Sequence, residues 1–326
     1  MNRMHDLAEF LENHDDYCLL THVYPDGDAC GTAIAMARAL LALGKRAFVY
    51  MPEGIPHSYA GFETGVCVAA DAAQFPYAPK TGFSVDVSVI DRMNGLDAFE
   101  ACAHTAMLDH HATNAGFGDV YFVDGGAAAC GELAVELINE LGVALDAIAA
   151  TWLYIAIATD CGRFGYGSTR SETLIAAAAC LRAGIDVDGI TRSVFLTRTE
   201  GRTRLLGLVL SGLERSADGR ICWARLTEDM LAQAGAVRED NEGIVNYLVE
   251  IEGVQAACLA EQRGAQTKLS LRCRLPYDIA RDVATPLGGG GHANAAGVTT
   301  NAAMDRALGI VLRQMRNMLD AAEECT

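Results

Sequence analysis

A strand, a polar loop and a helix follow one another near the N-terminus and constrain the fold more than any other stretch. Residues 17–20 are short and apolar, which predicts a strand, and residues 29–43 are rich in Ala and Leu, which predicts a helix that ends at Gly44. The loop between them carries one imidazole and two carboxylates, from His22, Asp26 and Asp28. Ligands of open α/β sheets bind where the strands end at their carboxyl side. The loop therefore marks a candidate ligand site.

The chemistry of this loop suits a hard divalent cation. Carboxylate oxygens together with one imidazole nitrogen favour Mn²⁺ or Mg²⁺ over metals that prefer thiolates. A plain structural alternative stays open at this point, because Asp-Gly-Asp before a helix is also a common Asx turn and N-cap. The rest of the chain has to decide between the two.

Strands and helices alternate over the first half of the chain. Further strands are predicted at residues 46–51, 83–88, 105–108 and 120–124, and further helices at residues 6–13, 131–141, 145–158 and 172–182. This alternation predicts the α/β class, with a doubly wound and mainly parallel sheet. We assign this first domain to residues 1–185.

The pattern changes after residue 185. Residues 186–204 predict a helical linker whose four arginines, Arg192, Arg198, Arg202 and Arg204, either form a solvated helix face or screen phosphate charge. Strands at residues 220–226, 254–260 and 267–274 and helices at 242–248 and 278–284 predict a second, smaller α/β domain over residues 205–326. We expect the active site in the cleft between the domains, and a frayed acidic tail at residues 320–326.

Charge and cysteine usage narrow the class of function. The formal net charge of −17 argues against binding a long nucleic-acid duplex, which needs clustered Lys and Arg, but it does not exclude a small phosphorylated substrate. The eleven cysteines form no C-x-x-C pair, and free thiols indicate a reducing cytoplasm. No apolar run reaches the roughly 18 residues of a membrane span, so no membrane partner is expected. Residues 1–12 lack the apolar core of a signal peptide.

Four separated segments each place an acidic or imidazole side chain at the end of a predicted strand. They are His22 with Asp26 and Asp28, then Asp86, then Asp109 with His110 and His111, and last Asp160. Strand ends of a doubly wound sheet converge on one edge, so these groups are expected to meet there. Each alone has a plain explanation, such as a helix cap or a buried core histidine. Together they supply enough ligands for two divalent ions.

Two such ions fit the hydrolysis of a phosphoester. Ions about 3.5–4 Å apart need a bridging carboxylate, and between them they can hold a hydroxide nucleophile. They also offset negative charge on the phosphoryl oxygens. One histidine of the His110-His111 pair is then available to steady the phosphate or to donate a proton.

In this order, the four segments resemble the motifs of the DHH phosphoesterase superfamily. Residues 240–246, 267–272 and the run GGGGHANAAG at 288–297 resemble its DHHA1 domain, so the resemblance covers nearly the whole chain. Asp-His-His alone is a weak signal, whereas the ordered set together with the glycine run is a strong one. The length and the pairing of domains most resemble the bifunctional oligoribonuclease and pAp phosphatase branch.

The resemblance implies two ions that share one carboxylate. The first ion would be held by His22, Asp26 and Asp86. The second would be held by Asp28, Asp86, His110 and Asp160. Mn²⁺ is the implied metal, with Mg²⁺ or Co²⁺ as substitutes. Asp109 would orient a ligand, His111 would face the scissile phosphate, and the protein would be a homodimer.

The resemblance also implies contacts with the substrate. They fall on Arg272, Gly288, Gly289, Gly290, Gly291 and His292 in the second domain, and on Asn114 and Arg163 in the first. Glycines let backbone N–H groups approach a phosphate, because no Cβ intervenes. The plain alternative for the four glycines is a tight connection between a helix and a strand. No Gly-Lys-Ser/Thr follows them, so they do not form a P-loop.

Three departures from the family pattern leave the ligands intact. Thr32 stands where the family usually has Ser, Leu287 where it has Phe, and Cys161 where it has Thr. These changes bear on substrate preference. The sequence thus predicts a metal-dependent phosphodiesterase that cuts very short oligonucleotides to 5′-mononucleotides and pAp to AMP and phosphate. The alternatives are a phosphodiesterase of signalling dinucleotides such as c-di-AMP, pApA or pGpG, a pyrophosphatase or polyphosphatase, and a non-catalytic nucleotide sensor.

Overall fold

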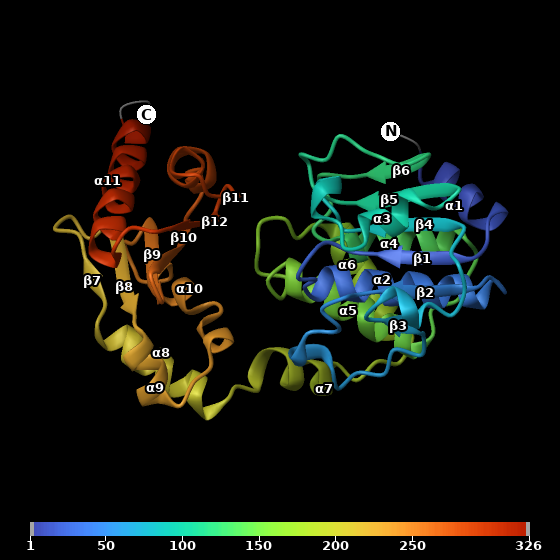
Figure 1. The fold of residues 1–326 in the computed structure, drawn as a ribbon, viewed down its shortest axis with the longest axis horizontal. Helices are drawn as coiled ribbons and strands as arrows, with labels where there is room; N and C mark the ends of the chain where they lie inside the picture. Colours follow the sequence, from blue (N-terminus) through green and yellow to red (C-terminus); the bar gives the residue numbers. More distant parts are fainter. Residues whose placement is uncertain (1–2, 324–326) are drawn as a thin grey trace. The chain divides into compact units, whose positions relative to one another are not determined.

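The computed structural model describes residues 3–323, apart from the side chains of His292 and Glu323. The chain divides into two compact units, Met1–Thr197 and Arg198–Thr326. The division lies inside the segment 186–204 that the sequence predicts as a linker. Each unit has its own sheet and its own core (Figure 1).

The first unit is built on a parallel sheet of six strands in the order β3-β2-β1-β4-β5-β6. The strands are β1 (Tyr17–Leu20), β2 (Ala47–Tyr50), β3 (Val68–Ala69), β4 (Thr81–Val85), β5 (His104–Asp109) and β6 (Val120–Val123). All residues of the central strands β1 and β4 are buried, which explains their near-continuous apolar runs. The predicted doubly wound, mainly parallel sheet is confirmed.

Helices pack on this sheet and supply most of its core. They are α1 (Met4–Asn13), α2 (Gly27–Ala42), α3 (Leu96–Glu100), α4 (Cys130–Glu140), α5 (Ala147–Asp160), α6 (Ser171–Arg182) and α7 (Val187–Thr191). The tightest contact joins α2 to α5, where a Cβ on Gly31 would stand 2.2 Å from the carbonyl oxygen of Trp152. Only glycine permits this approach, and it brings the start of α2 beside the end of α5.

The second unit carries a mixed sheet in the order β11-β12-β10-β9-β8-β7. Its strands are β7 (Glu214–Arg215), β8 (Ile221–Leu226), β9 (Ala256–Arg263), β10 (Gln266–Cys273), β11 (Gly290–His292) and β12 (Ala295–Thr300), and only β8 and β9 pair in parallel. One core lies under α11 (Met304–Glu323), and another lies under α8 (Glu200–Ser211), α9 (Glu228–Ala234) and α10 (Ile244–Val249). This is the predicted smaller α/β domain.

Some element predictions are wrong. The tail predicted as frayed from residue 320 continues α11 as far as Glu323, because Met315 and Leu319 anchor that helix in the core; residues 324–326 lie outside the described part. The helix predicted at 278–284 is a π-helical turn, Ala280–Ala284, followed by a 3₁₀ turn, Thr285–Leu287. Among the described residues, no helix is long and apolar enough to cross a bilayer.

Candidate metal centre

Asp86 lies at the centre of the predicted site, directly after β4. Its Oδ2 lies 3.7 Å from Nε2 of His22, and its Oδ1 lies 3.5 Å from Nε2 of His110. The residue has a positive φ of 57° and is 3% exposed. Its Oδ1 is buried and accepts no hydrogen bond from the described residues. A buried carboxylate between two imidazoles, with an oxygen that no donor satisfies, is an arrangement that suits a metal ligand shared by two ions.

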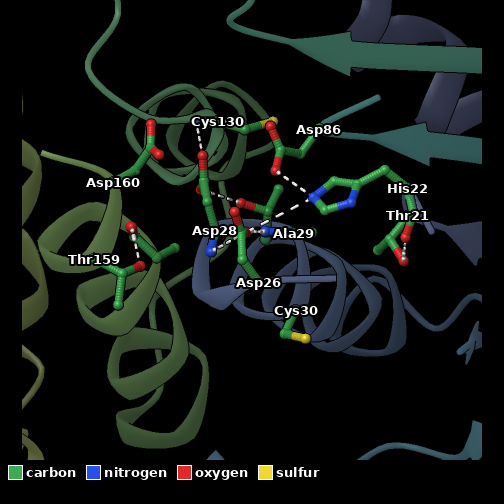
Figure 2. A network of polar contacts seen from close by, with 12 residues as sticks. Thr21, His22, Asp26, Asp28, Ala29, Cys30, Asp86, Cys130, Thr159 and Asp160 are labelled. Atoms are coloured by element: carbon green, nitrogen blue, oxygen red, sulfur yellow. Dashed lines mark hydrogen bonds and ion pairs between the residues drawn. The ribbon is translucent and has the colours of Figure 1, made fainter. Parts of the chain in front are cut away.

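A first group of ligands forms around His22, which follows β1. Nδ1 of His22 donates to the carbonyl of Val23 at 2.9 Å, and its Nε2 lies 3.8 Å from Oδ1 of Asp26. Figure 2 shows the carboxylates of Asp26 and Asp86 both directed at this nitrogen of His22. Asp26 is also the N-cap of α2, since its Oδ1 accepts hydrogen bonds from the backbone N–H groups of Asp28 and Ala29. The N-cap alternative and the ligand prediction thus describe the same carboxylate.

A second group forms around Asp28, in the first turn of α2. Nε2 of His110 lies 3.7 Å from Oδ2 of Asp28 and 3.5 Å from Oδ2 of Asp160. Asp28 is buried, and its two oxygens accept hydrogen bonds from the N–H groups of Cys130 at 2.6 Å and Gly131 at 2.8 Å. These donors belong to the first turn of α4, whose N-terminus stabilises a negative charge.

Asp160 reaches this group from a helix and not, as the sequence predicts, from the end of a strand. It is the last residue of α5, and the packing of α5 on α2 brings it beside Asp28 (Figure 2). The placement of Asp160 after a strand is wrong, because the helix predicted at residues 145–158 is α5 and continues as far as Asp160.

Both imidazoles present the nitrogen that a metal would use. Nδ1 of His110 donates to the carbonyl of Ala127 at 3.2 Å, as Nδ1 of His22 does to Val23. A carbonyl only accepts, so each Nδ1 carries the proton and each Nε2 directs its lone pair at the carboxylates. The separations of 3.5–3.8 Å are too long for hydrogen bonds. They suit ligands that share an ion, and the donor set therefore fits two divalent cations.

The electrostatics of the groups also favour bound cations. Burial, reinforced by the charge of Asp160, raises the pKa of Asp28 to about 7. Burial and the neighbouring Asp28 raise the pKa of Asp86 well above its ordinary value. Burial by itself lowers the pKa of His110, but the charges of Asp28 and Asp160 outweigh it and raise that pKa. A raised pKa keeps a proton on each group to a higher pH, and a bound divalent cation would replace such protons.

Asp109 and Asn114 hold His111 in place beside the two groups. Nδ1 of His111 donates to Oδ1 of Asp109 at 2.8 Å. Nδ2 of Asn114 donates to Oδ2 of Asp109 at 2.6 Å and to the carbonyl of Val87 at 2.9 Å, while Oδ1 of Asn114 accepts from the N–H of Gly116. Asn114 therefore uses both ends of its amide within the protein. The structure gives no support to a direct contact between Asn114 and substrate.

The predicted substrate residues of the second unit lie along β10, β11 and the turn before them. Nε of Arg272, on β10, donates to Oδ1 of Asn246 at 2.9 Å, a partner that the sequence did not indicate. Added Cβ atoms on Gly289 and Gly291 would stand 2.2 Å and 2.3 Å from backbone oxygens of β12. Close packing of this hairpin thus requires these two glycines whether or not they also bind a phosphate. The side chain of His292 lies outside the described part.

Arg163 completes the predicted set. Its guanidinium carbon lies 5.7 Å from the ring centre of Phe195, within the range of a cation–π contact. Its backbone has a positive φ of 57°, in the turn that follows Asp160. A contact of Arg163 with substrate stays a prediction.

Two family models match the chain. Residues 17–157 match the model described as the DHH family, N-terminal domain, and residues 221–326 match the DHHA1 domain. The first match covers every proposed metal ligand except Asp160. The second covers Arg272 and the glycine run.

Curated proteins and solved structures resemble nearly the full chain. The chain is 33% identical over 305 residues to the bifunctional oligoribonuclease and PAP phosphatase NrnA of Thermus thermophilus, over 93% of this chain and 90% of that one. It is 23% identical over 311 residues to the NrnA of Bacillus subtilis, over 90% and 92% of the two chains. The crystal structure of an exopolyphosphatase-related protein from Bacteroides fragilis has a TM-score of 0.89 and 25% identity, over 96% and 95% of the chains.

Proposed function

This chain belongs to the DHH family of phosphoesterases, in the branch that joins a DHH domain to a DHHA1 domain, and from that membership we propose its function. It hydrolyses very short oligonucleotides to 5′-mononucleotides, and it converts pAp to AMP and phosphate. Two relatives that match about nine-tenths of its length are bifunctional oligoribonucleases and PAP phosphatases by name.

The observation that supports this function best is the position of Asp86 between two ligand groups. His22 lies 3.7 Å from one of its oxygens and groups there with Asp26, and His110 lies 3.5 Å from the other oxygen and joins Asp86 to the group of Asp28 and Asp160. We propose that each group holds one divalent cation and that Asp86 contacts both. Cations bound there would polarise the phosphoryl oxygens and lower the pKa of a water molecule.

The remaining side chains of the site act on the substrate. The pair of Asp109 and His111 keeps the proton of the imidazole on Nδ1, at 2.8 Å from the carboxylate. We assign to His111 the contact with the scissile phosphate through Nε2. When the ring is protonated on both nitrogens, it transfers the Nε2 proton to the leaving oxygen and keeps the Nδ1 proton on the side of Asp109. Asp109 and Asn114 act through His111 by holding it in orientation.

The second unit is proposed to bind the rest of the nucleotide. Arg272 is held by Asn246 at 2.9 Å, which fixes a guanidinium suited to a phosphate. The backbone of Gly288, Gly289, Gly290 and Gly291, His292 and the first-domain residue Arg163 are the other proposed contacts. A second domain of this kind favours a nucleotide over bare pyrophosphate as the substrate.

Three further properties belong to the proposal. Mn²⁺ is the expected metal, because carboxylates with two imidazoles suit a cation of intermediate hardness, and Mg²⁺ or Co²⁺ would substitute. The ten described cysteines are free, which is consistent with a reducing cytoplasm. A homodimer is expected and is tested by the mass of the protein in solution.

Turnover of defined substrates tests the proposal. The purified chain is incubated with Mn²⁺ and 5′-labelled pApA, a labelled trinucleotide or pAp, and the products are separated by chromatography. We expect mononucleotides from the first two and AMP with phosphate from the third. Asp86→Asn should abolish all three reactions, whereas Asp97→Asn, an exposed carboxylate of α3, should leave them unchanged.

Other phosphate compounds, assayed in parallel, show which results would overturn the proposed function. Cyclic di-AMP, pGpG, pyrophosphate and polyphosphate are assayed in parallel at equal concentration. Faster turnover of a cyclic dinucleotide or of a phosphoanhydride than of pApA and pAp would refute the assignment. So would tight nucleotide binding without turnover in Mn²⁺, Mg²⁺ and Co²⁺.

A further inference from the structure

A closed ring of hydrogen bonds joins the start of α6 to the first turn of α4. Nε of Arg170 donates to Oε1 of Glu132 at 2.6 Å. The other oxygen of Glu132 accepts from the hydroxyl of Thr173 at 2.6 Å, and that hydroxyl accepts from the backbone N–H of Arg170 at 3.1 Å. Glu132 is 4% exposed, so the ring surrounds a buried carboxylate. Charge-assisted bonds of this length hold such a group in one orientation.

The ring also holds the loop between β6 and α4. Nη2 of Arg170 donates to Oδ2 of Asp124 at 2.7 Å, and Oδ1 of Asp124 accepts from the N–H of Gly126 at 2.9 Å. Oε2 of Glu132 accepts from the N–H of Ala128 at 3.2 Å. One arginine therefore fixes the loop at its first residue and, through Glu132, near its last.

This loop and the first turn of α4 that follows it support two members of the second ligand group through their backbone. The carbonyl of Ala127 accepts the Nδ1 proton of His110, which turns Nε2 towards the carboxylates. The N–H groups of Cys130 and Gly131 hold the two oxygens of Asp28 at 2.6 Å and 2.8 Å. Among the described residues, the ring makes no hydrogen bond to the first group, in which His22 bonds to Val23 and Asp26 caps its own helix.

We propose that Arg170 is a positioning residue that acts on one of the two cation sites only. Through Glu132, Asp124 and the loop between them, it holds His110 and Asp28 in the geometry that binds the second cation, and it leaves the site of His22 and Asp26 unaffected. This inference rests on the proposed two-cation centre. It goes beyond the proposed function because it assigns unequal control of the two sites to a residue that is not a ligand.

Metal titration of the full-length protein tests the selectivity. Mn²⁺ binding is followed by calorimetry and by the electron paramagnetic resonance of free Mn²⁺. The wild type should bind two ions per chain. Arg170→Met should keep one ion at its original affinity and bind the other about 10–100-fold more weakly, the range found when an outer partner of a metal ligand is lost. The spectrum of the coupled ion pair should then be replaced by that of a single ion.

Double variants identify the site at which Arg170→Met lowers the affinity for Mn²⁺. Asp160→Asn removes a ligand of the second group, so adding Arg170→Met to it should change the remaining affinity little. Asp26→Asn removes a ligand of the first group, so adding Arg170→Met to it should leave no ion at its original affinity. The proposal requires that the effects on Mn²⁺ affinity are non-additive when Arg170→Met is combined with Asp160→Asn. It requires that they are additive when Arg170→Met is combined with Asp26→Asn.

Control variants separate positioning from general destabilisation. Arg38→Met breaks a comparable pair with Asp146, held by bonds of 2.6–3.1 Å at the ends of α2 and α5 remote from Asp28 and Asp160, and it should keep both ions. Glu132→Gln keeps the shape of the ring and is the second test if Arg170→Met does not fold. Arg170→Lys should bind the second ion with intermediate affinity, because an ammonium cannot make both forked bonds.

The outcomes distinguish this inference from the proposed function. Two ions bound by Arg170→Met and Glu132→Gln with wild-type affinities would overturn the positioning role while leaving the proposed function intact. An equal loss of affinity for both Mn²⁺ ions in Arg170→Met would also overturn the positioning role. A wild type that binds no Mn²⁺ would overturn both.

Discussion

Asp109 accepts a hydrogen bond from Nδ1 of His111 at 2.8 Å, and this bond sets the tautomer of the imidazole proposed to contact the scissile phosphate. The other oxygen of Asp109 is held by Asn114 at 2.6 Å. Asp109 ends β5 and the other two residues follow it within five positions, so a local turn holds the imidazole, and the bond from Asn114 to the carbonyl of Val87 ties this turn to the segment after β4.

Asp109→Asn should therefore impair the reaction without removing the metals. An amide nitrogen in place of Oδ1 cannot accept the Nδ1 proton, so the imidazole loses its tautomer and orientation. We expect kcat to fall about 10²–10⁴-fold, as in other carboxylate–histidine pairs, with two Mn²⁺ ions still bound. Asp119→Asn, on the exposed loop before β6, is the control and should keep wild-type kcat. Loss of a metal ion from Asp109→Asn would assign Asp109 to the ligands instead.

Asp86→Asn should stabilise the metal-free protein although it abolishes activity. The buried Oδ1 of Asp86 has no hydrogen-bond donor, and burial together with Asp28 raises its pKa. A neutral amide relieves this charge, so unfolding of the variant in a chelator at pH 8 should need about 1–3 kcal/mol more than that of the wild type. Urea unfolding in EDTA measures the difference. With saturating Mn²⁺ the order should reverse, because only the wild type gains binding free energy; an unchanged order would contradict the bridging role.

Affinity for divalent cations should rise with pH up to about pH 7. In the metal-free protein the pKa of Asp28 is raised to about 7, so between about pH 4 and 7 the folded state holds a proton that the unfolded state has lost. A cation must displace this proton, and its apparent affinity therefore increases as the pH rises through that window and then levels off. Calorimetry in two buffers of different ionisation enthalpy counts the protons released. Affinity that is independent of pH from 5 to 7 would contradict the raised pKa.

The raised pKa of Asp28 makes the metal-free fold less stable as the pH rises, which is opposite to the trend in metal affinity. A carboxyl whose folded-state pKa is raised stabilises the fold below its unfolded pKa, and this contribution is lost as the pH rises through the folded value. The metal-free protein should thus unfold at progressively lower temperature from about pH 4 to 7. Excess Mn²⁺ should suppress the trend.

Most strands of the first sheet are predicted near their true positions because buried parallel strands are short apolar runs, although the strand expected at 83–88 is β4 (Thr81–Val85) and ends before Asp86. Asp86 and Asp109 lie where the apolar segments end, and the parallel register brings both to one edge of the sheet. The sorting of ligands into two sets is implied by family resemblance alone. The structure groups His22, Asp26 and Asp86 as the first set has them, whereas Asp28, His110 and Asp160 form one group and Asp86 lies in another with His110 and His111. Which ions bind there is still a proposal.

The parts that sequence reasoning missed depend on backbone atoms or on helix ends. The carbonyl of Ala127 and the N–H groups of Cys130 and Gly131 orient His110 and Asp28, but a backbone group has the same chemistry in almost any residue. The helix predicted at residues 145–158 ends at Asp160, but its sequence does not show that this last residue belongs to a helix and lies beside Asp28. In contrast, α11 has apolar residues at helical spacing, including Leu308, Val311 and Met315, so its pattern could have been recognised.

Gly31→Ala should destabilise the first unit and loosen the metal centre together. Its Cβ would stand 2.2 Å from the carbonyl oxygen of Trp152, so α2 and α5 must move apart. Overpacking of this kind costs about 1–3 kcal/mol, and it separates Asp28 from Asp160. Gly207→Ala is the control, because that helical glycine has open space around it and alanine should add about 0.5–1 kcal/mol. Thermal unfolding with and without Mn²⁺ compares the two variants. Equal melting temperatures for Gly31→Ala and Gly207→Ala would contradict the close approach of α2 to α5.

Asn246→Ala should weaken substrate binding through Arg272 and leave the chemistry of the first unit intact. Oδ1 of Asn246 accepts from Nε of Arg272 at 2.9 Å, and Nη1 of Arg272 donates to the carbonyl of Leu271 at 2.9 Å. Without Asn246 the guanidinium keeps its charge but loses one of the bonds that orient it, so phosphate contact becomes less frequent. We expect KM for pAp to rise about 3–10-fold, the effect of roughly one hydrogen bond, with kcat and Mn²⁺ binding unchanged.

Two comparisons make that result specific to Arg272. Arg272→Gln should raise KM further, and adding Asn246→Ala to it should have little additional effect, because the asparagine then has no guanidinium to orient. Arg274→Gln is the matched control: Arg274 lies two residues further along the chain and donates to the carbonyl of Val249, so its loss should leave KM for pAp unchanged. Steady-state kinetics with pAp measures all four variants. A fall in kcat with constant KM in Asn246→Ala would show that this asparagine acts on the reaction step and not on substrate binding.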